Sequence, residues 1–203
     1  VLVYAVSRVR GSASIIMIVL AGMVIGALFS ALVSLIKYVA DTQDVLPTIT
    51  FWLLGSLSGT TKLTLLQGSP FIIAGIILIF CLRWKLNLMT LSEDEATSLG
   101  VPVKRIRLLV ILGATMITAA VVSMCGLIGW VGLLIPHISR MAFGNNNKSV
   151  VPASIGLGAI FMLVIDTLAR SVTGTEIPVS ILTSIIGAPF FIILLRKTGG
   201  IQA

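Results

Sequence analysis

Long apolar runs separated by short polar segments dominate this chain. Residues 13–36 carry no charge, and a helix needs about 20 consecutive apolar residues to cross a membrane. Similar runs recur, and no short alternating strands are visible, so we expect helices, whose backbone groups are all hydrogen-bonded internally. The chain is predicted to be an all-α integral membrane protein with about six transmembrane helices. The predicted spans are residues 13–36, 64–82, 106–125, 127–142, 152–172 and 178–195.

Glycines interrupt the longest uncharged run, residues 108–135. The run is too long for one straight helix and too short for two full ones. Gly126, Gly129 and Gly132 lie within it, and Pro136 follows it. We therefore expect one full helix, a glycine-rich break and a short half-helix. The backbone at the break must be covered by protein or face a water-filled path.

Two other segments depart from a simple alternation of spans and loops. Residues 37–63 contain the apolar stretch Ile49–Leu57, which is too short to cross a membrane. We expect an amphipathic or re-entrant helix there. Gly187 and Pro189 predict a bend within the last span.

The charges orient the predicted spans. Only 10% of residues are charged, against about 25% in an ordinary soluble domain, and the net charge is +7. With the N-terminal segment inside and the spans alternating, most lysines and arginines fall inside, as the positive-inside rule requires. This distribution explains the net charge without any nucleic acid partner. The inside holds Arg8, Arg10, Arg83, Lys85, Lys104, Arg105, Arg107, Arg140, Lys148, Arg196 and Lys197, and the outside holds Lys37, Lys62 and Arg170.

The inner loop after the second span contains a short helix with signals at both ends. Ser92 and Glu95 have the spacing of a capping box. Glu93 and Asp94 add negative charge in the first turn, where the helix dipole favours it. Gly100 is placed to end the helix. The pattern predicts a helix of about two turns.

Ala96 and Leu99 give this short helix one small apolar face. Helices of this length are marginal alone, so we expect it to dock on something. Two interpretations remain open from the residues: contact with a partner, or a connector lying on lipid headgroups.

Polar residues within or near the spans are few. His137 is the only histidine, and a zinc site needs several ligands, so we expect a structural, hydrogen-bonded histidine and no metal. Asp166 and Arg170 lie four residues apart on one helical face. They predict either a self-satisfied ion pair or a positive site at the outer mouth, and the spacing leaves both open.

These residues bear on the competing functions. No G-x-x-x-x-G-K-[ST] motif occurs, so no P-loop ATP hydrolysis is expected. An intramembrane enzyme using His137 or Asp166 would lack a second catalytic group. An ion-coupled secondary transporter of small solutes is the alternative transport function, because broken helices suit it.

Several stretches together resemble the FecCD-type permeases of iron-siderophore, haem and cobalamin ABC importers. Residues 126–140 (GLIGWVGLLIPHISR) are similar to the family's G-x-I-G-F-V-G-L-x-x-P-H-x-x-R, with Trp130 where Phe is common. Residues 91–101 are similar to L-G-E-x-x-A-x-x-L-G, with Ser92 in place of Gly. The remaining stretches are Phe51–Leu57 (FWLLGSL, like W-x-x-G-S), Asp166–Arg170, Glu176–Val179 with Pro178, and Gly187–Phe190 (GAPF).

The resemblance implies the fold and the partners of an importer subunit. It implies a homodimeric, multi-pass permease in the prokaryotic cytoplasmic (inner) membrane, with two ATPase subunits and an extracytoplasmic binding protein. It also implies a single permease domain over residues 1–203, part of a ten-helix fold whose first four helices are missing. The expected function is ATP-driven import of an iron-siderophore, haem or cobalamin-type metal chelate, with ATP bound by the partner and no cofactor on this chain.

The resemblance further implies roles for particular residues. Arg170 would receive the binding protein, and the coupling helix at residues 91–101 would contact the ATPase. Its expected contact residues are Ser92, Glu93, Asp94, Glu95, Ala96, Leu99 and Gly100. The expected structural motif residues are Gly126, Gly129, Gly132, Pro136, His137, Arg140, Asp166, Pro178, Gly187 and Pro189.

Overall fold

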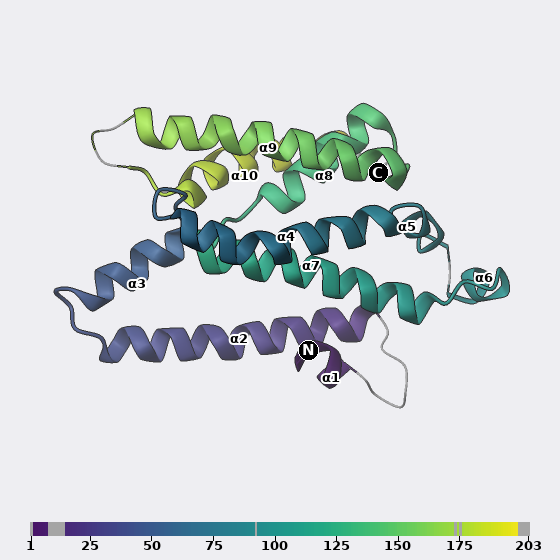
Figure 1. The fold of residues 1–203 in the computed structure, drawn as a ribbon, viewed down its shortest axis with the longest axis horizontal. Helices are drawn as coiled ribbons and strands as arrows, with labels where there is room; N and C mark the ends of the chain where they lie inside the picture. The colour runs from purple at the N-terminus through teal and green to yellow at the C-terminus, as the bar shows by residue number, and fades with distance from the viewer. Residues whose placement is uncertain (1, 8–14, 92, 173, 175, 199–203) are drawn as a thin grey trace. The chain divides into compact units, whose positions relative to one another are not determined.

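The computed structural model describes residues 2–7, 15–91, 93–172, 174 and 176–198. Ten helices and no strand occur in these ranges, so the predicted all-α fold is confirmed (Figure 1). The chain divides into two compact units, residues 1–50 and 51–203, which are described separately. The single permease domain over the whole chain stays a prediction.

The first unit contains α1 (Leu2–Ser7) and α2 (Ile15–Val39), and α3 (Val45–Leu54) crosses the boundary into the second. Helix α2 is long and apolar enough to cross a membrane, as predicted for residues 13–36. Helix α3 has 10 residues, which is too short to cross. This agrees with the short helix expected in residues 37–63.

The second unit contains the remaining five predicted spans and the inner loop. Three of its helices are long and apolar enough to cross a membrane, namely α4, α7 and α9. Helix α8 has 13 residues and is the half-helix expected after the glycine-rich break. The bounds are α4 Lys62–Leu82, α5 Lys85–Leu88, α6 Glu93–Ser98, α7 Val103–Cys125, α8 Val131–Phe143, α9 Asn147–Ser171 and α10 Val179–Thr198.

The helices of the second unit form two layers (Figure 1). Helix α4 packs along α7, whereas α8 packs on α9 and α10 packs on both. Glycines bring α4 and α7 close, because a Cβ on Gly75 would lie 2.8 Å from the Gly113 carbonyl oxygen. A small core of Ile165, Ala169 and Val179 joins α9 to α10. Many other large apolar side chains are exposed, as expected where lipid covers a helix.

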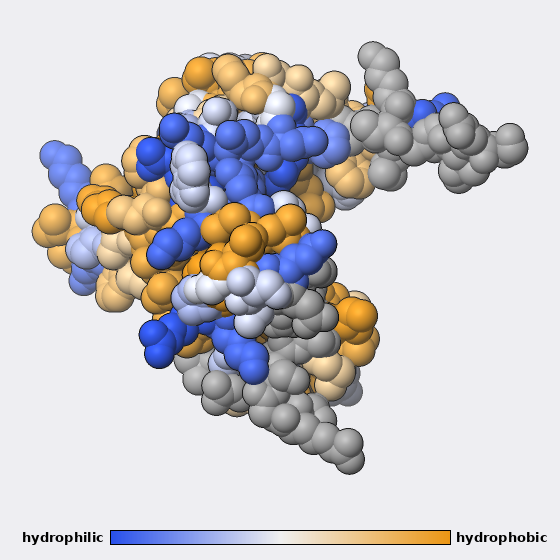
Figure 2. All heavy atoms as spheres, turned by 90° about the vertical axis from the view of Figure 1, so that its right-hand side faces the viewer, coloured by the Kyte–Doolittle hydropathy of each residue, from blue (hydrophilic) through white to orange (hydrophobic). Residues whose placement is uncertain are grey.

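Antiparallel order gives the second unit two distinct ends. We call the end with the α4 N-terminus and the α7 and α9 C-termini the glycine end, and the opposite end the basic end. Figure 2 looks onto the basic end, where hydrophilic side chains gather. The antiparallel arrangement is the one that the charge pattern requires, and the side of the membrane that each end faces stays a prediction. Among the described residues of this unit, the basic end carries Arg83, Lys85, Lys104, Arg105, Arg107, Arg140, Lys148 and Arg196, and the glycine end carries Lys62 and Arg170.

Candidate functional site

Two backbone segments touch directly at the glycine end. Gly55 has φ +72° and Gly126 has φ +73°, a conformation that L side chains rarely adopt. A Cβ on Gly126 would overlap the carbonyl oxygen of Trp52. The N–H of Ser56 donates to the carbonyl of Cys125 at 2.9 Å. The stretches 51–57 and 126–140 therefore meet through their main chains, and no side chain fits between them.

The start of α10 joins the same place. The N–H of Val179 donates to the carbonyl of Gly55 at 3.0 Å, and the hydroxyl of Ser180 donates to the carbonyl of Leu54 at 2.5 Å. The first N–H groups of a helix lack partners within the helix, so this contact satisfies one of them. Pro178 immediately precedes Val179 and has no N–H to satisfy. Three motif stretches that are far apart in sequence thus form one junction.

The break between α7 and α8 ends at a strained residue. Trp130 has φ +66°, which is an outlier for a bulky side chain. A Cβ on Gly187 of α10 would lie 2.8 Å from the Trp130 Cβ. The Trp130 ring also meets Phe191 edge-on, with centroids 6.4 Å apart. The predicted break is confirmed, and α10 covers its end through the Gly187 backbone and the Phe191 side chain, as lipid requires.

Two other predicted motif glycines lie differently. A Cβ on Gly129 or on Gly132 would meet no atom within 4 Å. Packing among the described residues therefore gives no reason for glycine at these positions. Helix α10 is continuous through Gly187 and Pro189, and the bend expected there stays a prediction.

Arg170 and Asp166 form a bidentate ion pair at the glycine end. The arginine Nε lies 2.9 Å from Asp166 Oδ2, and its Nη2 lies 3.1 Å from Oδ1. On its other side, Arg170 Nη1 lies 4.0 Å from Glu176 Oε1, and the hydroxyl of Ser58 donates to the same carboxylate. The ion pair, one of the two interpretations that the spacing left open, is present. The Arg170 side chain is 46% exposed, and its docking role stays a prediction.

The short helix of the inner loop is present as α6 at the basic end. It is ended by paired hydrogen bonds: the N–H of Gly100 donates to Thr97 at 2.9 Å, and that of Val101 donates to Ala96 at 3.1 Å. This pattern is a Schellman motif, and it confirms the predicted stop at Gly100. Ala96 is 1% exposed and α6 packs on α7, whereas Leu99 is 66% exposed. The predicted apolar face is therefore divided: Ala96 serves the fold and Leu99 stays accessible.

The start of α6 is described only in part. Ser92 and the side chains of Glu93 and Asp94 lie outside the described residues, and so does the predicted capping box. Glu95 is exposed. The roles of these four residues stay predictions.

Helix α8 contacts α9 through its middle. The hydroxyl of Ser154 on α9 donates to the hydroxyl of Ser139, which donates to the carbonyl of Ile135. Pro136 lies within α8 beside this contact. His137 is half-buried and has no hydrogen-bond partner in the described part of the chain, so the hydrogen bond expected for it is not found there.

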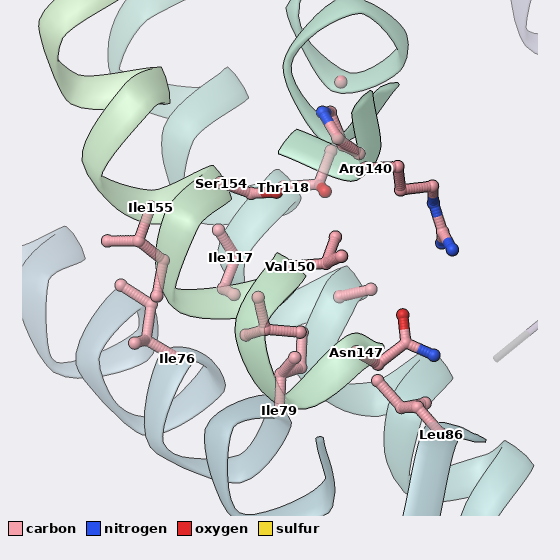
Figure 3. Close-up of a pocket in the computed structure, with 14 residues that line it drawn as sticks. Ile76, Ile79, Leu86, Ile117, Thr118, Arg140, Asn147, Val150, Ser154 and Ile155 are labelled. Carbon is pink, nitrogen blue, oxygen red and sulfur yellow. The ribbon is translucent and has the colours of Figure 1, made fainter. Parts of the chain in front are cut away.

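A cavity of about 600 Å³ separates the two layers. Apolar side chains of α4, α7 and α9 point into it, including Ile76, Ile117 and Ile155 (Figure 3). Arg140 lines it and extends away from the apolar side chains, and Asn147 lies near Leu86 of α5. The cavity therefore has apolar walls and a polar edge.

Sequence reasoning missed three features of this site. The close approach of Gly75 and Gly113 had a readable signal, since small residues in apolar helices mark helix contacts. The cavity had none, because hydrophobic periodicity does not say which helices become neighbours. The contact of Asn87 with Asn146 also had none, because both residues lie outside the predicted spans and about sixty residues apart.

The chain is similar to known proteins over almost its whole length. The FecCD transport family matches residues 1–197. The molybdate import system permease protein MolB of Haemophilus influenzae is 45% identical, over 97% of this chain and 58% of its own length. A probable iron chelatin permease of Helicobacter pylori is 40% identical over 98% and 60%, and the hemin permease HmuU of Yersinia pestis is 36% identical over 97% and 56%.

A solved structure gives the same fold. The solved structure described as "an inward-facing conformation of a putative metal-chelate type ABC transporter" superposes with a TM-score of 0.88 at 45% identity, covering 91% of this chain and 60% of its own. The chain thus spans about three fifths of the length of the relatives that it matches.

Proposed function

Because the chain belongs to the FecCD transport family, we propose that it forms part of the permease subunit of an ABC importer. The substrate class is a metal chelate, of the kind for which the iron chelatin, hemin and cobalamin relatives are named. The chain performs no covalent chemistry, and a separate ATPase subunit hydrolyses ATP. Transport follows alternating access in a prokaryotic cytoplasmic membrane, with the basic end inside, as the positive-inside rule requires.

The geometry of α6 is the observation that supports this proposal most. The Schellman turn and buried Ala96 fix α6 to the start of α7, so a displacement of α6 acts on a spanning helix. Leu99 offers an apolar contact at the basic end, where cytoplasmic ATPases would bind. A short helix fixed on one side and exposed on the other suits the transfer of motion from a partner.

The remaining partners follow from the glycine end. Arg170 keeps nearly half of its side chain exposed there, although Asp166 holds its guanidinium. An extracytoplasmic binding protein with an acidic surface would complement this arginine. Two ATPase subunits and a second permease copy complete the proposed assembly.

Substitution of Leu99 tests the α6 contact. Leu99→Asp places a charge in the proposed interface, so we expect co-purification of the ATPase and substrate-stimulated hydrolysis in liposomes to fall at least tenfold, since burying an unpaired charge costs more than about 1.4 kcal/mol. Leu99→Met keeps the apolar area and should retain both. Ser92→Ala should have a milder effect, because loss of a cap typically costs about 1 kcal/mol.

The amount of co-purified ATPase and the stimulated hydrolysis are compared between variants that are present in equal amounts in the membrane. Wild-type association and stimulation with Leu99→Asp would mean that α6 is only a connector, and the proposed ATPase contact would be abandoned. The surface change Thr97→Ser serves as the control for handling and expression.

A further inference from the structure

Asn87 of α5 reaches across sixty residues of sequence to the start of α9. Its Nδ2 donates to the Oδ1 of Asn146 at 2.8 Å, and its Oδ1 accepts from the backbone N–H of Asn147 at 2.8 Å. The Oδ1 of Asn146 also accepts from the N–H of Lys148 at 3.0 Å, which is the N-cap bond of α9. We call these two paired amides, Asn87 and Asn146, the asparagine clasp.

The hydrogen-bond partners fix how both amides are oriented. A backbone N–H can only donate, so the atoms facing Asn147 N and Lys148 N must be oxygens. The Asn87 nitrogen then has to face the Asn146 oxygen, as it does. Rotating either amide by 180° would break a bond to the backbone. The clasp therefore has one arrangement, and both residues are needed for it.

The clasp connects the segment before α6 to a helix that crosses the whole unit. The carbonyl of Asn87 accepts from both the N–H and the hydroxyl of Thr90, and the N–H of Leu91 donates to Leu88. These hydrogen bonds form turns in the segment that follows Asn87, up to Leu91. Beyond the clasp, α9 has 25 residues, about 37 Å of rise, and Arg170 lies in its last turn.

Helix α6 is therefore attached to both layers at the basic end. It packs on α7 directly, and it reaches α9 through α5 and the clasp. The lining of the cavity includes Leu86 and Asn147, which are the sequence neighbours of Asn87 and Asn146.

We infer that Asn87 and Asn146 are positioning residues that transmit movement of the α6 segment to α9, and so across the membrane to the Arg170 end. This inference rests on the proposed function, because it takes α6 as the segment that an ATPase moves. The asparagine clasp sets how far α9 follows α6. Loss of the clasp would remove this hydrogen-bonded link to α9 and leave α6 bound to its partner and packed on α7.

The test measures coupling separately from assembly. In the intact transporter reconstituted in liposomes, the readouts are ATPase co-purification and the amount of substrate imported per ATP hydrolysed. Asn87→Leu has similar size and removes both hydrogen bonds, so we expect normal co-purification and roughly a tenfold fall in substrate per ATP. Asn87→Asp keeps the acceptor for Asn147 and should give an intermediate loss.

Two further variants make the test specific. Asn146→Ser keeps an N-cap acceptor for α9 but is too short to reach Asn87, so it should match Asn87→Leu. The double variant should be no worse than the worse single one, because both substitutions remove the same link. Asn145→Leu is the matched control, since the Asn145 side chain has no hydrogen bond in the part of the chain that the structure describes. It should leave the ratio unchanged.

Each contrary outcome has its own meaning. If Asn87→Leu and Asn87→Asp import as much substrate per ATP as the wild type, even with less protein in the membrane, the clasp only stabilises the fold. That result would overturn the inference. Additive losses in the double variant would also overturn it. If the unsubstituted chain brings no ATPase, the proposed function itself fails, which the co-purification arm shows before any variant is compared.

Discussion

The two ends of the second unit are joined by different means. At the glycine end, main chain meets main chain at Gly55 and Gly126, and the start of α10 adds a backbone hydrogen bond. At the basic end, the layers meet through the side-chain amides of Asn87 and Asn146. The junction at the glycine end requires residues without side chains, whereas the contact at the basic end requires two side-chain amides. We therefore expect the glycine end to be the fixed end and the basic end to be adjustable.

The largest expected effect comes from adding one methyl group at the glycine end. Gly126→Ala would force a Cβ into the Trp52 carbonyl at a positive φ, and we expect a loss of about 3 kcal/mol in the free energy of unfolding. Thermal unfolding in detergent measures it. Gly132→Ala is the control, because its Cβ would meet no atom within 4 Å. Equal stability of the two variants would show that the glycine end is not the fixed one.

A second substitution tests the contact of α10 with Trp130, the residue with a positive φ at the end of the break. Gly187→Ala brings a Cβ within 2.8 Å of the Trp130 Cβ, and overpacking of this kind costs about 1–3 kcal/mol. Gly156→Ala lies in α9 with open space around it and should stabilise by up to about 1 kcal/mol through helix propensity. Unfolding of both variants in one detergent compares them. The same sign for both would argue against a tight contact between α10 and Trp130.

The charged group of the glycine end should affect binding more than folding. Arg170→Glu places a third carboxylate beside those of Asp166 and Glu176. Capture of the binding protein should therefore weaken roughly tenfold at low salt and less at high salt. Pull-down by permease in liposomes measures it, and ATPase assembly should persist. Lys62→Glu, at the same end, is the matched control. Unchanged capture at low ionic strength would leave Arg170 with only its ion pair.

The smallest perturbation is cysteine labelling, which shows the side of the membrane that each end of the second unit faces. Single cysteines at Gly59 and Lys148, in a chain whose native Cys81 and Cys125 are replaced by alanine, should react from opposite sides of the membrane. The basic end should be inside, so an impermeant maleimide added outside should label Gly59→Cys alone. Labelling of both positions from outside would refute the orientation.

Much of the fold was readable because lipid imposes simple requirements. The apolar runs gave the long helices α2, α4, α7 and α9 within a few residues, and three glycines with Pro136 gave the break and the half-helix α8. Gly100 gave the end of α6, where the structure has a Schellman motif. These are local signals, in which neighbouring residues decide the outcome.

The contacts between distant segments were not readable from one sequence. Nothing local says that Gly126 must be glycine because the Trp52 carbonyl lies against it. Likewise, Asn87 looks like an ordinary loop residue until its amide is seen beside α9. The apolar face of α6 was read as one surface, but tertiary packing buries Ala96 and leaves Leu99 outside. Such outcomes depend on which helices become neighbours, and that is a property of the whole bundle.

The junction at the glycine end also sets an order of events during synthesis. The hydroxyl of Ser180 meets the carbonyl of Leu54 across 126 residues of chain, and the N–H of Val179 meets Gly55 beside it. Both carbonyls are made long before α10 exists. While the ribosome is still producing α4 to α9, they need another donor, such as water in the insertion machinery. The junction closes only when α10 has been made, because its donors are Val179 and Ser180.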